Sequence, residues 1–185
     1  MAKNKKKKAR VNNTHTTRKS VSNSKSPLYN TNNLTFDFSY SNWIRGIRTK
    51  DFCNKLSGPD EFSKQIFKCL YELIPYVQKN WDRIKRNPQS KEFPHCHLMA
   101  KSKESLVKEV IQKTHTDEDI DLDNDYKIWQ IGLNQGLRAY AIYNHNSNTL
   151  FPVFIDYFHQ IHASEKHNHK QDLSSKSFCP IDHYL

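Results

Sequence analysis

Two histidines near the end of the chain have neighbours that suit proton-transfer chemistry. His159 and His162 come directly after an apolar stretch, residues 149–158, and Arg138 lies in the apolar stretch before it. An imidazole exchanges a proton near pH 7, and an arginine beside it supplies a fixed positive charge. Cleavage of a phosphodiester uses both, a base that activates the nucleophile and a cation that stabilises the developing charge. The plainer alternative is that both histidines are ordinary strand-end residues and that Arg138 pairs with an acid such as Asp156.

A second group of residues carries the ligand types that zinc prefers. His95 and His97 flank Cys96, and Cys179 and His183 lie near the end of the chain. Alternate residues of a strand point to one face, so His95 and His97 could share an ion with Cys179, whereas Cys96 would point away from them. The spacing matches no standard zinc module. We therefore expect buried or hydrogen-bonded roles for these residues, and we predict no metal and no other cofactor.

A basic run marks the start of the chain. The 185 residues carry 29 Lys and Arg against 19 Asp and Glu, a net charge of +10. Nine of the basic residues and none of the acids lie in residues 1–26, so the rest of the chain is close to neutral. An undiluted run of lysines gains affinity for a polyanion by releasing counterions, which favours RNA or the ribosome over a merely solubilising tail. The residues expected to contact nucleic acid are Lys5, Lys6, Lys7, Lys8, Arg10, Arg18 and Lys19.

The composition changes at about residue 34. Residues 1–33 are polar and have almost nothing to bury, so they cannot offset the entropy lost on ordering, and we predict a disordered basic tail. Residues 34–185 are long enough for one core and too short for two ordinary ones, so we predict a single domain there.

Within this domain the pattern predicts an α+β fold. Apolar residues alternate with period two in residues 34–40, which predicts a strand, and they recur with a helical period in residues 57–86, where Pro75 predicts a kink or a break. Three further apolar runs joined by short turn-forming segments predict an antiparallel meander, in which Pro152 suggests an edge or an irregular start of the last strand. We expect two or three helices on one face of an antiparallel sheet of about four strands. The third helix is expected at 103–113, and the meander strands at 127–133, 137–143 and 149–158.

The cysteine pattern and the absence of long apolar runs bear on location. The four cysteines are widely spaced, and no secretory leader precedes them. No window is apolar enough to cross a bilayer. We expect a cytoplasmic protein that does not associate with membranes.

The meander resembles the closing β-hairpins of the RelE/ParE-like toxin superfamily. In that family an arginine-bearing strand, a short turn and an apolar strand end at a histidine or tyrosine, and the resemblance covers residues 57–162 at most. The residues that fall on the pattern are Leu137, Arg138, Phe154, Ile155 and His159. The segments FPHCH, FIDYFHQIH and FCPIDHYL are also similar to small uncharacterised bacterial proteins.

The toxin resemblance implies a metal-independent mRNA endonuclease, partnered by an antitoxin protein. It assigns Arg138 as the cation that stabilises phosphate, His159 as the proton-transfer group and His162 as a second one. Three features depart from the family pattern: the near-neutral domain, an acidic segment at residues 117–125 that is expected to be a solvated loop, and about twenty residues beyond the fold.

Three functions are therefore open at the level of sequence. RNA binding with endonuclease activity is the leading hypothesis. A non-enzymatic module is the alternative, in which the domain recognises a protein or nucleic acid and the tail adds electrostatic adhesion. A metal-stabilised module is the third.

Overall fold

The computed structural model describes residues 33–88, 90–116, 120, 127–133, 136–163 and 175–185. The segment Asn32–Leu185 clusters as one compact unit. Nearly all of the predicted tail, residues 1–33, and all of its expected nucleic-acid contacts lie outside the described residues. None of the described helices has the length and apolar character needed to cross a membrane.

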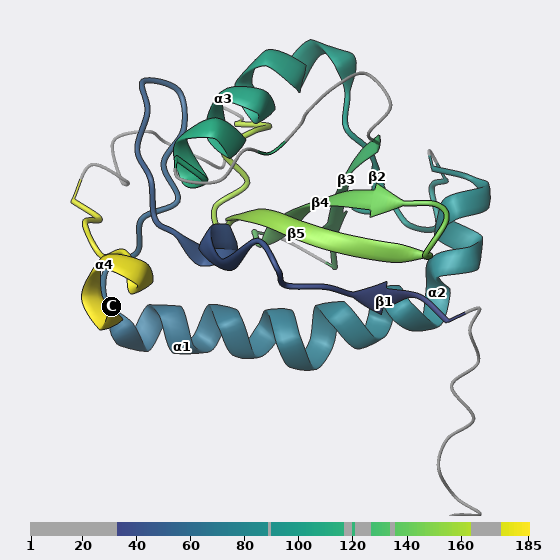
Figure 1. Ribbon diagram of the computed structural model, residues 1–185, viewed down its shortest axis with the longest axis horizontal. Coiled ribbons are helices and arrows are strands. Elements are labelled where there is room, and N and C mark those ends of the chain that lie inside the picture. Colours follow the sequence, from purple (N-terminus) through teal and green to yellow (C-terminus); the bar gives the residue numbers. More distant parts are fainter. Residues whose placement is uncertain (1–32, 89, 117–119, 121–126, 134–135, 164–174) are drawn as a thin grey trace, which may run out of the picture. The chain divides into compact units, whose positions relative to one another are not determined.

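A five-stranded sheet forms the centre of this unit (Figure 1). The predicted meander is confirmed, because consecutive strands pair antiparallel along it. Two very short strands extend the sheet: one pairs antiparallel with the first meander strand, and the other pairs parallel with the last. The spatial order is β1-β5-β4-β3-β2, with β1 Thr35–Phe36, β2 His97–Leu98, β3 Lys127–Gly132, β4 Arg138–Asn144 and β5 Thr149–Asp156.

Two irregularities follow from local chemistry. Pro152 lies inside β5, a central strand, where the pairing with β4 shifts register between Tyr140 and Ala141. A proline has no N–H for the ladder, and here the bulge accommodates it, so the irregularity that was one of the two expectations is present. β5 is not an edge strand, although β1 pairs only with Thr149 and Leu150 and does not extend to Pro152. The first strand is shorter than its alternation predicts, because the Asp37 carboxylate accepts a hydrogen bond from the Ser39 amide and turns the chain.

One long helical segment runs along the sheet without a break. It comprises α1 Pro59–Phe67, a π-helical segment Lys68–Leu73, labelled η3, and α2 Ile74–Arg86. Pro75 supplies no N–H for the Tyr71 carbonyl, and the helix responds by widening into the π segment instead of breaking. Separate helices are α3 Glu104–Thr114 and α4 Pro180–Tyr184, with short 3₁₀ turns η2 Ser41–Ile44 and η4 Lys101–Lys103.

The α+β class is confirmed, but the helices cover both faces of the sheet rather than one (Figure 1). Trp129 and Ile131 of β3 face α2 in one core cluster, whereas Ile128 faces α3 in a second one. Alternate residues of a strand point to opposite faces, and β3 is buried along both. A strand buried on both sides needs a cover on each, which is the physical reason for the second layer.

Candidate functional site

Four histidines from two distant parts of the sequence meet around Arg138. We call His95, His97, His159 and His162 the histidine cluster. The ring centroids of His159 and His162 are 5.7 Å apart, those of His97 and His162 are 6.3 Å apart, and Nη2 of Arg138 lies 3.1 Å from Nδ1 of His95. All four imidazoles are half-buried. The two groups predicted separately from the sequence therefore form one site.

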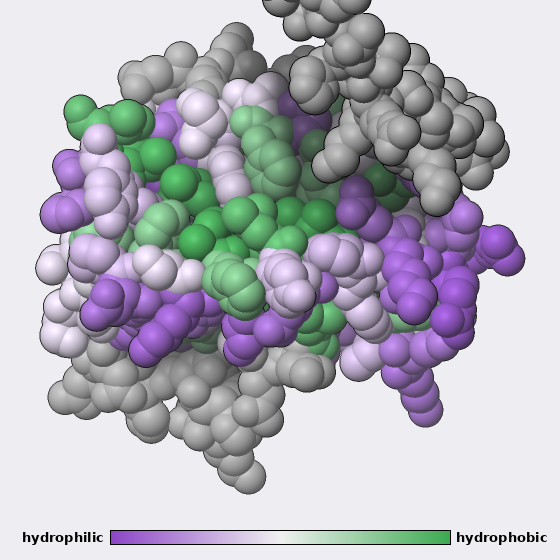
Figure 2. All heavy atoms as spheres, turned by 90° about the horizontal axis from the view of Figure 1, so that it is seen from below, coloured by the Kyte–Doolittle hydropathy of each residue, from purple (hydrophilic) through white to green (hydrophobic). Residues whose placement is uncertain are grey.

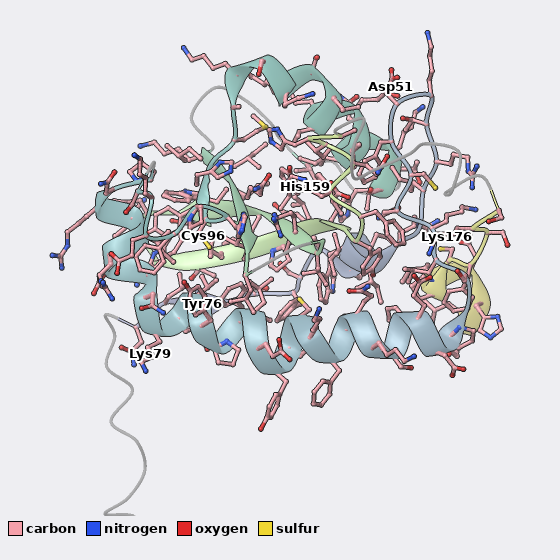
Figure 3. All side chains as sticks on the ribbon, turned by 180° about the vertical axis from the view of Figure 1, so that it is seen from behind. Asp51, Tyr76, Lys79, Cys96, His159 and Lys176 are labelled. Atoms are coloured by element: carbon pink, nitrogen blue, oxygen red, sulfur yellow. The ribbon has the colours of Figure 1, made fainter. Side chains whose placement is uncertain are left out.

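The strand register explains this meeting. Arg138 opens β4 directly opposite Asp156, the last residue of β5, and also pairs with Gly132 at the end of β3. His97 of β2 pairs with Gln130 of β3, close to the same end of the sheet. Figure 3 shows His159 beyond the end of β5 and Cys96 beside β2.

Asp156 holds the turn that carries His159 and His162. Its side chain is fully buried and accepts hydrogen bonds from the backbone amides of Phe158 (3.2 Å), Gln160 (2.8 Å) and Ile161 (2.9 Å). Burial raises the pKa of Asp156 to about 6, against the opposing effect of these amides and of Arg138. Asp156 is therefore ionised at neutral pH, opposite the guanidinium.

His159 has a backbone conformation that a residue with a side chain rarely adopts. Its φ is +57°, in the left-handed region. Such strain persists only where the surrounding structure determines it, and it concentrates at functional sites. In this turn the three hydrogen bonds from backbone amides to the Asp156 carboxylate hold the backbone of His159 in this conformation.

Arg138 is buried, and its guanidinium contacts the ring of His95. Its side chain is 2% exposed, Nη1 donates to the Leu137 carbonyl at 2.9 Å, and Nη2 contacts His95. A guanidinium only donates, so Nδ1 of His95 must accept, and the neutral ring carries its proton on Nε2. Burial first, and then Arg138, lowers the pKa of His95. The sequence-based role of Arg138 as a direct phosphate contact would require it to leave this position.

His97 is fixed through a buried chain of polar groups. Its Nδ1–H donates to the Leu98 carbonyl at 2.9 Å, so the neutral ring can accept only at Nε2, where Nε2 of Gln130 donates at 3.0 Å. The Tyr140 hydroxyl in turn donates to Oε1 of Gln130 at 2.8 Å. Sequence reasoning missed Gln130 and Tyr140, although a glutamine inside the apolar segment KIWQIGL was a usable signal.

His159 and His162 both have lowered pKa values. Burial lowers the pKa of His159 to about 4, and Arg138 and the other cluster histidines lower it further in the same direction. The pKa of His162 is lowered by burial first, then by His97 and Lys103. Both rings are therefore predominantly neutral at pH 7 and can accept a proton. Lys103, half-buried in η4, is a cation that sequence reasoning did not select.

The metal candidates do not come together. Cys179 accepts a hydrogen bond from the Gly46 amide at 3.2 Å and packs near α4, and the Cys96 thiol donates to the Gly132 carbonyl in the core. No three His, Cys, Asp or Glu side chains among the described residues are arranged to hold a metal ion. The set His95, His97 and Cys179 is therefore not a site, because the two histidines are engaged by Arg138 and Gln130 instead.

Comparison with known families gives a match over most of the chain. The model of the family described as Uncharacterised protein UU032 matches residues 39–185. The chain belongs to the UU032 family. A curated relative, Uncharacterized protein UU032 of Ureaplasma parvum serovar 3 (strain ATCC 700970), is 28% identical over 176 residues, which is 95% of each chain. No solved structure shows significant similarity.

Membership of the UU032 family overturns the resemblance to RelE/ParE toxins, because the matching model is that of a different family. The pattern that suggested the toxins is an arginine-bearing strand, a turn, an apolar strand and a terminal histidine. Any antiparallel meander with polar groups at the strand ends produces it. The antitoxin partner was implied only by that resemblance and has no other support.

Proposed function

We propose that this protein binds RNA and cleaves a phosphodiester bond through the histidine cluster, by proton transfer from side chains alone. The observation that carries the proposal is the division of roles among the rings. Arg138 fixes His95 as an N–H donor, while His159 and His162 stay neutral and able to accept a proton. General acid–base cleavage of a phosphodiester needs one neutral imidazole as the base and a second imidazole that has taken up a proton as the acid, and the His95 N–H can in addition donate to the phosphate oxygens.

The proposed reaction uses the ribose hydroxyl next to the bond. His159 accepts the 2′-OH proton, the O2′–P bond forms, and the P–O5′ bond breaks as protonated His162 returns a proton to O5′. The products are a 2′,3′-cyclic phosphate and a free 5′-OH. In this proposal His95 Nε2–H and Lys103 stabilise the charge on the phosphate oxygens. His162 carries the required proton below its lowered pKa, so the rate should be highest in mildly acidic solution.

Two further expectations belong to this proposal. The basic residues of the N-terminal segment, from Lys5 to Lys19, would add electrostatic affinity for RNA or the ribosome. A cytoplasmic location is supported by the four cysteines, all of which are free thiols.

The test is cleavage of an end-labelled, unstructured RNA by the full-length protein in the presence of a chelator. Wild type should produce fragments ending in cyclic phosphate, and His159→Ala should lose at least about 100-fold in rate, the usual contribution of a positioned base. His183→Ala is the matched control, because His183 lies in α4 against Phe178, outside the histidine cluster. Equal cleavage by wild type and His159→Ala would remove the catalytic assignment.

The burial of Arg138 favours a second candidate, a module that binds RNA without cleaving it. A guanidinium engaged by Leu137 and His95 and facing Asp156 is already compensated, and it stabilises the site whether or not a substrate arrives. RNA that binds to wild type but stays intact over the whole pH range would select this alternative.

A further inference from the structure

A patch of exposed apolar side chains lies on the long helical segment, on the opposite side of the helix from the core. Phe67 is 59% exposed, Leu70 49% and Tyr71 71%. The rings of Phe67 and Tyr71 stack on each other, with centroids 5.0 Å apart and planes inclined by 19°. Figure 2 views the molecule from the side of this segment and shows hydrophobic residues gathered between hydrophilic ones.

The π segment explains why these side chains face outward. The Ile74 amide bonds to the Cys69 carbonyl, five residues back, so the turn contains one residue more than an α-helical turn. The buried positions become Cys69 and Leu73, which are each 1% exposed. Leu70 belongs to the buried stripe of a regular helix and is turned outward here. The exposure of the patch is therefore built into the backbone.

Lysines border the stacked rings. Lys64 lies three residues before Phe67 in α1, the spacing that places side chains on one helix face, and Lys68 directly follows Phe67 at the start of the π segment. Both lysines are exposed, and neither forms an ion pair with an acid in the part of the chain that the structure describes. Two acids are also exposed on this segment, Asp60 four residues before Lys64 and Glu72 beside Tyr71. Two lysines and two acids thus lie around the stacked rings.

We propose that Phe67 and Tyr71 form a stacking platform for the bases of single-stranded RNA, with Lys64 and Lys68 contacting its phosphates. Aromatic faces interleaved with cations are how proteins hold single strands without reading sequence. In a duplex the base faces are covered by their neighbours and cannot reach such a platform. This inference rests on the RNA-binding part of the proposed function and does not depend on cleavage.

A second copy of the chain fits the patch less well. A stable interface buries about 800 Å² on each partner with charges depleted at its centre. Here three apolar side chains lie among two lysines and two acids. Such charges disfavour burial in a protein interface, whereas the lysines can contact the phosphates of a single strand.

The experiment is binding of a fluorescent single-stranded oligonucleotide to full-length protein, followed by anisotropy. The double variant Phe67→Ala, Tyr71→Ala should bind about 5- to 100-fold more weakly, the range for losing one or two stacked bases. Tyr184→Ala is the matched control, because Tyr184 is 60% exposed in α4, away from the lysine pair. The wild-type protein should bind the same sequence more weakly as a duplex.

Several outcomes would overturn the platform. Unchanged affinity of the double variant, or equal affinity for single strand and duplex, would do so. A change from dimer to monomer in sedimentation, or loss of binding to anionic vesicles with RNA binding intact, would assign the patch to another partner. If wild type binds RNA without cutting it, only the cleavage proposal fails. If wild type binds no RNA, both proposals fall.

Discussion

At the level of single residues, Asp156 lies between Arg138 and the turn that carries His159 and His162. Its carboxylate orders the turn through three backbone amides and faces Arg138 across the strand pair. Arg138 in turn fixes the proton of His95. Asp156 thus holds the turn in which His159 has its strained backbone, and Arg138, which faces Asp156, sets the tautomer of His95.

Replacing Asp156 by Asn should cost about 3–5 kcal/mol in the free energy of unfolding. An amide keeps the size of the side chain but places an NH₂ group against a backbone N–H and leaves Arg138 without its facing charge. Chemical denaturation measures the loss. Asp82→Asn is the control, because Asp82 is exposed and forms only a distant pair with Lys85, so its effect should stay below about 0.5 kcal/mol. A similar small effect for both variants would contradict the organising role.

The lowered pKa of His159 gives a pH dependence of stability with a definite sign. The unfolded chain protonates this residue below about pH 6.5, whereas the folded protein resists until about 4. The neutral ring therefore contributes its full share of stability above pH 6.5, and this share is lost as the pH falls toward 4. Relative to His159→Gln, wild type should lose about 1–2 kcal/mol across that range, a value reduced because the ring is half exposed. An NMR titration of His159 with its midpoint near 6.5 would contradict this.

The residue types predicted some members of the site but not how they are arranged in space. His159, His162 and Arg138 could be predicted because the chemistry of imidazole and guanidinium groups follows from the residue type alone. Their convergence with His95 and His97 depends on strand pairing across more than thirty residues, which no local pattern reports. Nor does the sequence state that Arg138 is buried, since burial results from the whole fold.

At the level of elements, strong periodicity was predictive and short or non-local pairing was not. The three meander strands and the two principal helices follow from apolar spacing. Strand β2 has two residues, too few to show a period. The alternation in residues 34–40 did predict a strand at β1, but not that it would be two residues long or that it would pair with a strand more than a hundred residues away. An apolar stripe predicts that α3 packs, but the stripe does not say on which face.

The path of the Arg138 side chain over β3 leaves room only for a glycine at position 132. A Cβ there would lie 2.6 Å from Cδ of Arg138, a distance that real contacts essentially never show. Gly132→Ala should cost about 1–3 kcal/mol of stability by displacing this side chain, and the ¹⁵N shifts of His95 should lose the Nε2–H tautomer. Gly58→Ala is the control, because nothing lies within 4 Å of a Cβ at that position. An unchanged His95 tautomer in the Gly132 variant would show that Arg138 does not fix it.

For the molecule as a whole, the positive charge is concentrated in the N-terminal residues and not in the domain that contains the histidine cluster. The net charge of +10 comes almost entirely from residues 1–26, while the domain has nearly balanced charges. The electrostatic part of the proposed RNA affinity is therefore assigned to residues 1–26, and the proposed chemistry to the domain.

This division predicts how salt should act on RNA binding. Each lysine that neutralises a phosphate of a single strand contributes about 0.7 to the slope of log affinity against log salt concentration. In the full-length variant Lys5→Gln, Lys6→Gln, Lys7→Gln, Lys8→Gln, the slope should fall by up to about 3, and affinity at low salt should drop most. A variant of the domain pair Lys108→Gln, Lys113→Gln removes two cations already engaged by Glu104 and Glu109, so its slope should match wild type. If the tail variant also matches wild type, RNA affinity resides in the domain, and the basic run only keeps the protein soluble.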